Sequence, residues 1–111
     1  MKSIIRIAIL VLAAVSLVAC GDVPSAPPQT VELQIIDPPA PPQRVELQLG
    51  AEVTMRITTA IDDHAHLHGY ELEEFTSAGE TIEWNFTADM AGSYELESHE
   101  TDSIWANVVV S

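Results

Sequence analysis

Apolar and polar residues alternate with a period of two along much of the chain. The alternation is present in residues 45–49, 53–58, 82–87 and 94–97, and an apolar run at 106–111 ends the sequence. Turn-forming residues, glycine above all, separate several of these ranges. Because successive side chains of a strand point to opposite faces, a period of two predicts half-buried β-strands rather than helices.

A short repeat adds a further strand to this pattern. Val31-Glu32-Leu33-Gln34 is repeated as Val45-Glu46-Leu47-Gln48, and we interpret both copies as strands joined by residues 37–42. The histidine-rich residues 64–68 also fit a strand, whereas residues 70–75 and 103–106 have room for at most one helical turn. About seven short strands predict an all-β fold, a small antiparallel sandwich or barrel.

The first twenty residues carry a separate signal. Lys2 and Arg6 precede an apolar stretch at 7–18, and Leu17-Val18-Ala19-Cys20 closes it. The stretch is shorter than the roughly 20 residues that span a bilayer, which is typical of a secretory signal peptide. The closing residues resemble the lipobox of bacterial lipoproteins, which implies cleavage before Cys20 and lipidation of its thiol. An ordinary signal peptide with a chance cysteine is the alternative.

Proline and aromatic residues divide the rest of the chain. All seven prolines lie between Pro24 and Pro42, whereas the aromatic residues begin at Tyr70. We therefore expect a signal peptide at 1–19, a lipidated and proline-rich tether at 20–30, and a folded domain at 31–111. This organisation predicts an extracytoplasmic protein anchored to a bacterial membrane, on the periplasmic side or at the cell surface.

The charge balance narrows the classes of partner. The chain has 4 Lys and Arg against 17 Asp and Glu, a net charge of −13. This charge would repel nucleic acids and anionic lipids, but it suits cations. Several glutamates are interpreted as solvated strand faces and loops, namely Glu71, Glu73, Glu74, Glu95, Glu97 and Glu100. No combination of residues predicts an enzyme active site.

Three of the four histidines lie close together, in Asp62-Asp63-His64-Ala65-His66-Leu67-His68. Histidines two apart on a strand share a face at about 6.5 Å, close enough to chelate one ion. We expect His66 or His68 to bind a metal together with His99 from another segment. His64 or Glu97 would complete the set, and Asp62 and Asp63 could orient the rings. Nitrogen and oxygen ligands favour Cu(II) over Zn(II) or Fe(III).

The order of motifs resembles the cupredoxin-like domain of the EfeO type. The resemblance covers about residues 30–111 and rests on His66-Leu67-His68-Gly69-Tyr70, Phe86-Thr87-Ala88-Asp89 and Gly92-Ser93-Tyr94 with His99. It implies a Greek-key β-sandwich with copper as cofactor. Ser98 stands where a blue-copper protein has its cysteine, and Met90 precedes the glycine turn instead of the last strand. These departures exclude blue-copper electron transfer.

Two functions remain open at this point. The first is a membrane-anchored protein that captures, buffers or hands over a transition metal, copper in preference, beside a transporter or terminal oxidase. The second is a metal-free structural or protein-interaction module on the same lipid anchor, in which the histidines only form hydrogen bonds. Trp84 and Trp105 are expected to pack in the core in either case.

Overall fold

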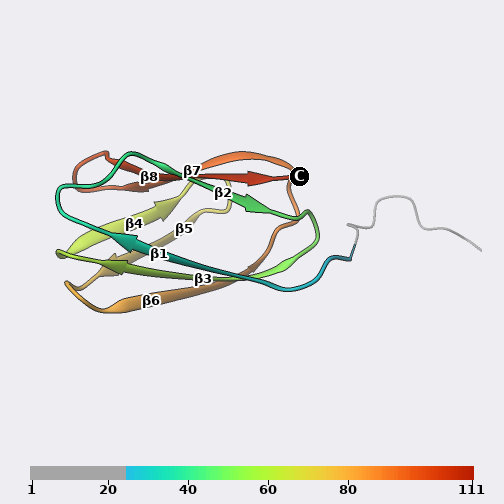
Figure 1. The fold of residues 1–111 in the computed structure, drawn as a ribbon, viewed down its shortest axis with the longest axis horizontal. Coiled ribbons are helices and arrows are strands. Elements are labelled where there is room, and N and C mark those ends of the chain that lie inside the picture. Colours follow the sequence, from blue (N-terminus) through green and yellow to red (C-terminus); the bar gives the residue numbers. More distant parts are fainter. Residues whose placement is uncertain (1–24) are drawn as a thin grey trace, which may run out of the picture.

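The computed structural model describes residues 25–111, which form eight β-strands in two sheets (Figure 1). No helix occurs among these residues, so none is long and apolar enough to cross a membrane. The predicted signal peptide and Cys20 lie outside the described residues. The strands are β1 (Gln29–Ile35), β2 (Gln43–Leu47), β3 (Glu52–Thr59), β4 (Asp63–Leu67), β5 (Leu72–Thr76), β6 (Thr81–Thr87), β7 (Gly92–Ser98) and β8 (Ile104–Val110).

The two sheets face each other as the layers of a sandwich. One sheet has the order β1-β3-β6, and the other has the order β2-β8-β7-β4-β5. The pairs β1–β3 and β2–β8 are parallel, while all other neighbours are antiparallel. The predicted all-β sandwich is therefore confirmed, with eight strands in place of about seven.

The two copies of the repeat form edge strands of different sheets. The first copy lies in β1 beside β3, and the second lies in β2 beside β8. In each copy the leucine is buried, Leu33 and Leu47, while the glutamates are exposed. β1 already includes Gln29 and Thr30, which the sequence placed in the tether.

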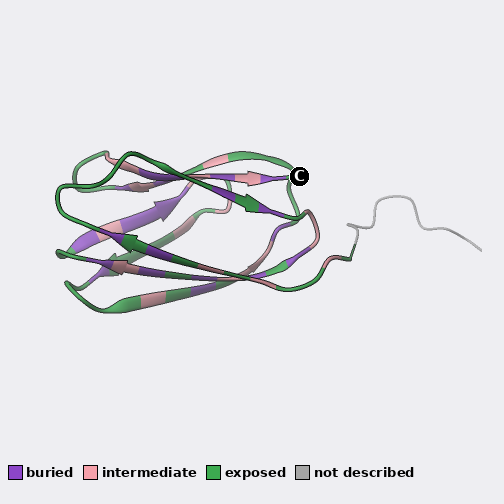
Figure 2. Cartoon of the chain, viewed as in Figure 1, coloured by how far each residue is buried: buried purple, intermediate pink, exposed green. Residues whose placement is uncertain are grey.

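β5 is the strand that the sequence did not predict. Its residues show no alternation, because Thr76 is its only buried residue and the three before it are exposed. Backbone pairing with β4 stabilises the strand instead, and β5 forms one edge of the five-stranded sheet. Figure 2 shows the contrast between the largely buried β4 and the largely exposed β5.

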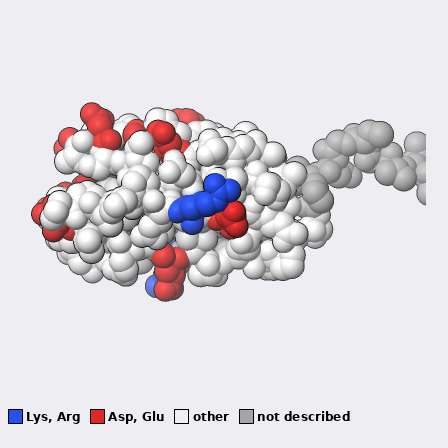
Figure 3. All heavy atoms as spheres, turned by 45° about the horizontal axis from the view of Figure 1, so that its top comes forward, with Lys and Arg blue, Asp and Glu red and all other residues white. Residues whose placement is uncertain are grey.

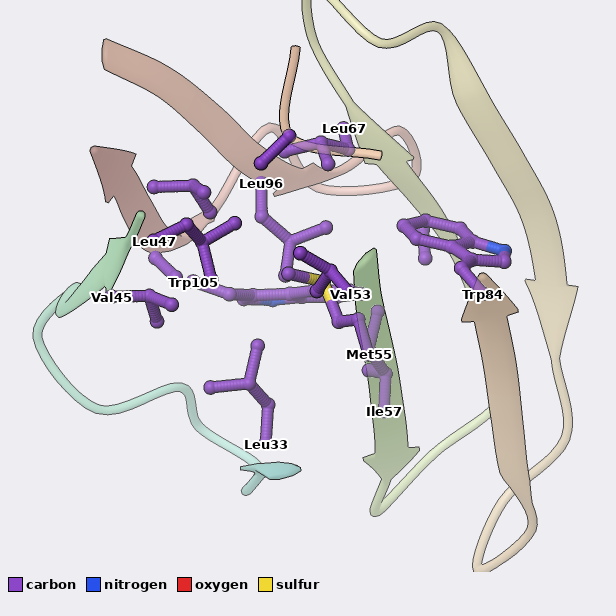
Figure 4. Packing of buried hydrophobic residues seen from close by; sticks show 14 of the residues in the cluster. Leu33, Val45, Leu47, Val53, Met55, Ile57, Leu67, Trp84, Leu96 and Trp105 are labelled. Carbon is purple, nitrogen blue, oxygen red and sulfur yellow. The ribbon is translucent and has the colours of Figure 1, made fainter. Parts of the chain in front are cut away.

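Apolar side chains from both sheets fill the space between them. In Figure 4 the ring of Trp105 lies in the middle of this core, near Met55 and Leu96. Trp84 is also buried, so both tryptophans pack as expected. Each large side chain that is fully buried contributes roughly 1.5–3 kcal/mol to folding.

The direction of the side chains on β4 decides where the histidines lie. Ala65 and Leu67 are completely buried in the core. Because side chains alternate along a strand, His64 and His66 point to the opposite, outer face of the five-stranded sheet. The histidines thus lie outside the sandwich and not between its two sheets.

Candidate metal centre

His66 is at the centre of the cluster because the sheet places carboxylates on both sides of it. It pairs with Glu73 of β5 and with Glu97 of β7 in the strand register. Its Nε2 lies 3.9 Å from Glu73 Oε1, and its Nδ1 lies 3.7 Å from Glu97 Oε1. All three side chains are therefore on the outer face of the sheet.

His99 joins this cluster from the segment that follows β7. Its backbone N–H donates a hydrogen bond of 2.8 Å to the carbonyl of His64. The centroid of its ring is 4.4 Å from that of His66 and 5.0 Å from that of His64. The structure thus brings together the two distant segments that the sequence expected to share a site.

His68 follows β4 and completes the row of four imidazole rings. Its ring centroid is 4.3 Å from that of His66, and its Nε2 is 2.5 Å from Glu97 Oε1. Its backbone N–H also donates to the carbonyl of Glu95. At the other end of the row, His64 stacks on Phe75, which is 73% exposed.

Three overlapping groups in this row have ligand atoms close enough to hold a metal ion. Within each group these atoms lie within 4.8 Å of one another, and the groups are His64, Glu73 and His99; His66, Glu97 and His99; and His68, Glu95 and Glu97. The five residues that the sequence predicts as ligands, His64, His66, His68, His99 and Glu97, all occur in these groups. Glu73 and Glu95 were interpreted as surface charges, and Glu73 could be recognised only from its register with His66.

The ring of His66 fits a metal better than it fits a hydrogen-bonding role. Its side chain is only 8% exposed, and neither ring nitrogen has a hydrogen-bond partner among the described residues. The nearest carboxylate oxygen, from Glu71, is 3.5 Å from Nε2. A buried polar group without a partner costs about 1–3 kcal/mol, and coordination of a metal would remove that cost.

The charge of the cluster also favours a cation. The hydrogen bond with His68 lowers the pKa of Glu97 below its usual value of 4.5, although partial burial opposes this shift. The only Lys or Arg residues in the described chain are Arg44 and Arg56, which lie beside Glu46 and Glu83. Figure 3 shows how few basic side chains accompany the acidic ones on the visible face. No Lys or Arg among residues 25–111 therefore neutralises the cluster.

Ser98 is buried on the inner face of the sheet and does not face the histidines. Its hydroxyl donates to Asp63 Oδ1 at 2.5 Å and accepts the backbone N–H groups of Glu100 and Thr101. The same oxygen of Asp63 accepts the backbone N–H of His64, and Asp62 accepts that of Ala78. These aspartates thus bind backbone N–H groups and Ser98 rather than the imidazole rings. The carboxylates beside the rings are those of glutamates such as Glu73 and Glu97. The donor set does not fit a blue-copper centre.

Comparison with known proteins identifies solved structures that share this fold. No family model matches the sequence, and no curated protein matches it. Several solved structures are similar to this chain. A laccase from Botrytis aclada has a TM-score of 0.63 and 13% identity, and the match covers 81% of this chain and 23% of the laccase. A heme-copper terminal oxidase dimer has a TM-score of 0.57 and 15% identity over 73% of this chain and 60% of the oxidase chain, and a copper nitrite reductase from Nitrosomonas europaea has a TM-score of 0.54 and 18% identity over 75% of this chain and 42% of the reductase. The chain has a cupredoxin-like fold. It spans less than two thirds of the length of each of these three chains.

The cupredoxin-like fold thus confirms the coarser part of the resemblance seen in the sequence. At identities of 13–18%, the similarity concerns the fold and not the activity. The groups of this cupredoxin-like domain that could hold a metal ion consist of histidines and glutamates, on the outer face of the five-stranded sheet.

Proposed function

We propose that this protein is a lipid-anchored, extracytoplasmic cupredoxin-like protein that binds copper through a thiolate-free site. Its ligands are His66, His99 and Glu97, with His64 and His68 beside them. One observation carries the proposal: the buried ring of His66 has two unpartnered nitrogens between carboxylates on both neighbouring strands. The role is capture, buffering or handover of the ion, without blue-copper electron transfer and without catalysis.

The chemistry of the ligands supports copper in the form of Cu(II). Imidazole and carboxylate groups bind Cu(II) more strongly than the other divalent ions of the first transition row. The structural relatives include a laccase and a copper nitrite reductase, which agrees with copper in this fold. The lipobox-like sequence at Cys20 supports the anchor, and a transporter or terminal oxidase in the same membrane is the proposed recipient.

A metal-free interaction module is the second candidate function, and Phe75 favours it. This aromatic side chain is 73% exposed at the end of the histidine row, as at many protein interfaces. In such a module, however, both nitrogens of His66 would stay buried and unpartnered. We therefore prefer copper binding.

Titration of the full chain, produced without a histidine tag, distinguishes the two functions. Calorimetry should show that the first equivalent of Cu(II) binds more tightly than roughly 1 μM, or about 8 kcal/mol. Electron paramagnetic resonance should show nitrogen hyperfine structure, and the absorption spectrum should lack an intense blue band. His66→Ala and His99→Ala should each weaken binding at least tenfold.

Glu80→Gln is the matched control for these variants, because it removes an exposed carboxylate from the turn before β6. It should bind Cu(II) like the unmodified protein. If His66→Ala and His99→Ala also keep the original affinity, the proposed site is wrong. If binding is only weak, multiple and sensitive to salt, the interaction module replaces the copper protein.

A further inference from the structure

Two of the three ligand groups have no residue in common. His64, Glu73 and His99 form one of them, and His68, Glu95 and Glu97 form the other. The carboxylates come from opposite neighbours of β4, since Glu73 belongs to β5 while Glu95 and Glu97 belong to β7. Both groups can therefore bind an ion at the same time without competing for a side chain.

His66 lies between these two groups and presents one ring nitrogen to each. Its Nε2 faces Glu71 and Glu73 at 3.5 and 3.9 Å, whereas its Nδ1 faces Glu97 at 3.7 Å. Its ring also contacts the rings of His68 and His99, with centroids 4.3 and 4.4 Å away. Both nitrogens are buried and have no hydrogen-bond partner among the described residues.

We infer that the cluster holds two divalent copper ions at once and that His66 bridges them. This inference rests on the proposed copper-binding function and adds a second ion to it. One ion would take Nε2 of His66 with His64, Glu73 and His99. The other would take Nδ1 of His66 with His68, Glu95 and Glu97. The ring releases its one N–H proton to solvent when the second nitrogen binds, and no electron is transferred.

The charges around the row match two dications better than one. Four carboxylates line it, those of Glu71, Glu73, Glu95 and Glu97. Together with the imidazolate of His66 they carry five negative charges, so two divalent ions leave an excess of only one. A single ion would leave an excess of two negative charges in a partly buried cluster, where solvent screens charge less than at the surface. The four carboxylates also offset the repulsion between the two ions.

Exposure along the row provides access for both ions. The side chains of His68 and His99 are 45% and 36% exposed, whereas that of His66 is 8% exposed. An ion can reach each outer group from solvent, and the bridging ring between them remains protected from water. A shared ligand that is buried and held by its neighbours keeps a fixed geometry toward both ions.

Cu(II) titration of the full chain, followed by native mass spectrometry and electron paramagnetic resonance, tests the bridge. We expect two ions per chain. The resonance signal should grow up to the first equivalent and then fall as the second ion binds, because an imidazolate bridge couples the two spins. His68→Ala should bind one ion and keep its full signal. Glu80→Gln, the matched control, should bind two ions and lose its signal.

His66→Ala removes the bridge and with it one ligand of each ion, so binding should weaken, and any two ions that this variant still binds should give the signal of two independent spins. Two independent spins in the unmodified protein would overturn the bridge. A single tight ion that depends on His66 would also overturn it, but would leave the proposed function intact. No stoichiometric binding at all would overturn both proposals.

Discussion

Ser98 illustrates how a single buried side chain holds the end of β7 in place. Its hydroxyl makes three hydrogen bonds, with the carboxylate of Asp63 and the backbone of Glu100 and Thr101. Ser98→Ala would leave these groups without their partner, so we expect a loss of about 1–3 kcal/mol in the free energy of unfolding. Urea denaturation measures this loss. Ser77→Ala, at an exposed turn, should change stability by less than about 0.5 kcal/mol; equal effects of both substitutions would contradict the argument.

Glu97 links the stability of the metal-free protein to pH. The hydrogen bond with His68 lowers the pKa of Glu97 below 4.5, so folding favours its ionised form. The stabilisation by ionised Glu97 is fully present above the pKa that Glu97 has in the unfolded chain. It is lost as pH falls through the lower pKa that Glu97 has in the folded chain. The free energies of unfolding of the unmodified protein and His68→Ala should therefore converge as pH falls from 6 to 3. Denaturation with a chelator present checks this, and curves that stay parallel would refute it.

At the scale of residues, the sequence identified the histidines of the candidate site more completely than its glutamates. The histidines are few, and their spacing of two on a strand already placed His64 and His66 on one face. Glutamates are common in this acidic chain, and most of them are solvated. Glu73 is distinguished from the other carboxylates by its register with His66, and Glu95 by the backbone hydrogen bond that its carbonyl accepts from His68.

The turn between β4 and β5 depends on a glycine that fixes the end of the histidine row. Gly69 has a φ of +80°, and a Cβ at this position would overlap the ring of Tyr94. Gly69→Ala should therefore combine the cost of a left-handed backbone, about 1–2 kcal/mol, with a steric clash. We expect a greater loss of stability, measured by urea denaturation, than the backbone cost alone. We also expect weaker Cu(II) binding, because His68 directly precedes Gly69.

Gly79 offers the matched control for this substitution. Its φ is +77°, nearly the same, but a Cβ there would meet nothing within 4 Å. Gly79→Ala should lose only the backbone contribution and should bind Cu(II) unchanged. If the two variants lose equal stability, the contact between Gly69 and Tyr94 does not constrain the turn.

At the scale of elements, alternation predicted the strands that pack one face on the core. The repeats in β1 and β2 and the runs in β3, β6 and β7 follow it, because every second side chain is less exposed than its neighbours over most of each strand. β8 follows it from Ala106 onward. β5 follows no such pattern, since its place depends on backbone pairing with β4 at a sheet edge. A pattern of side chains carries no information about that pairing.

For the whole molecule, the sequence predicted a sandwich but not the face on which its histidines would lie. In the structure, Ala65 and Leu67 occupy the inner face of β4, so His64 and His66 lie on its outer face. The resemblance to cupredoxins placed a cysteine-equivalent residue beside the metal. In the folded chain that residue, Ser98, faces the opposite side of the sheet. Similarity of fold therefore does not fix which side chains of this molecule lie together at a candidate site.

Copper should stabilise the whole domain if the cluster forms only in the folded chain. β4, β5, β7 and the segment after β7 together supply the ligands, so the unfolded chain cannot present the same set. At a free Cu(II) concentration of 100 times Kd, this linkage contributes about 2.7 kcal/mol. For a domain of this size the melting temperature should rise by roughly 15 °C. His66→Ala should show about half of this rise or less and Glu80→Gln all of it, measured by calorimetry. An equal rise in His66→Ala would mean that the stabilising ion binds elsewhere.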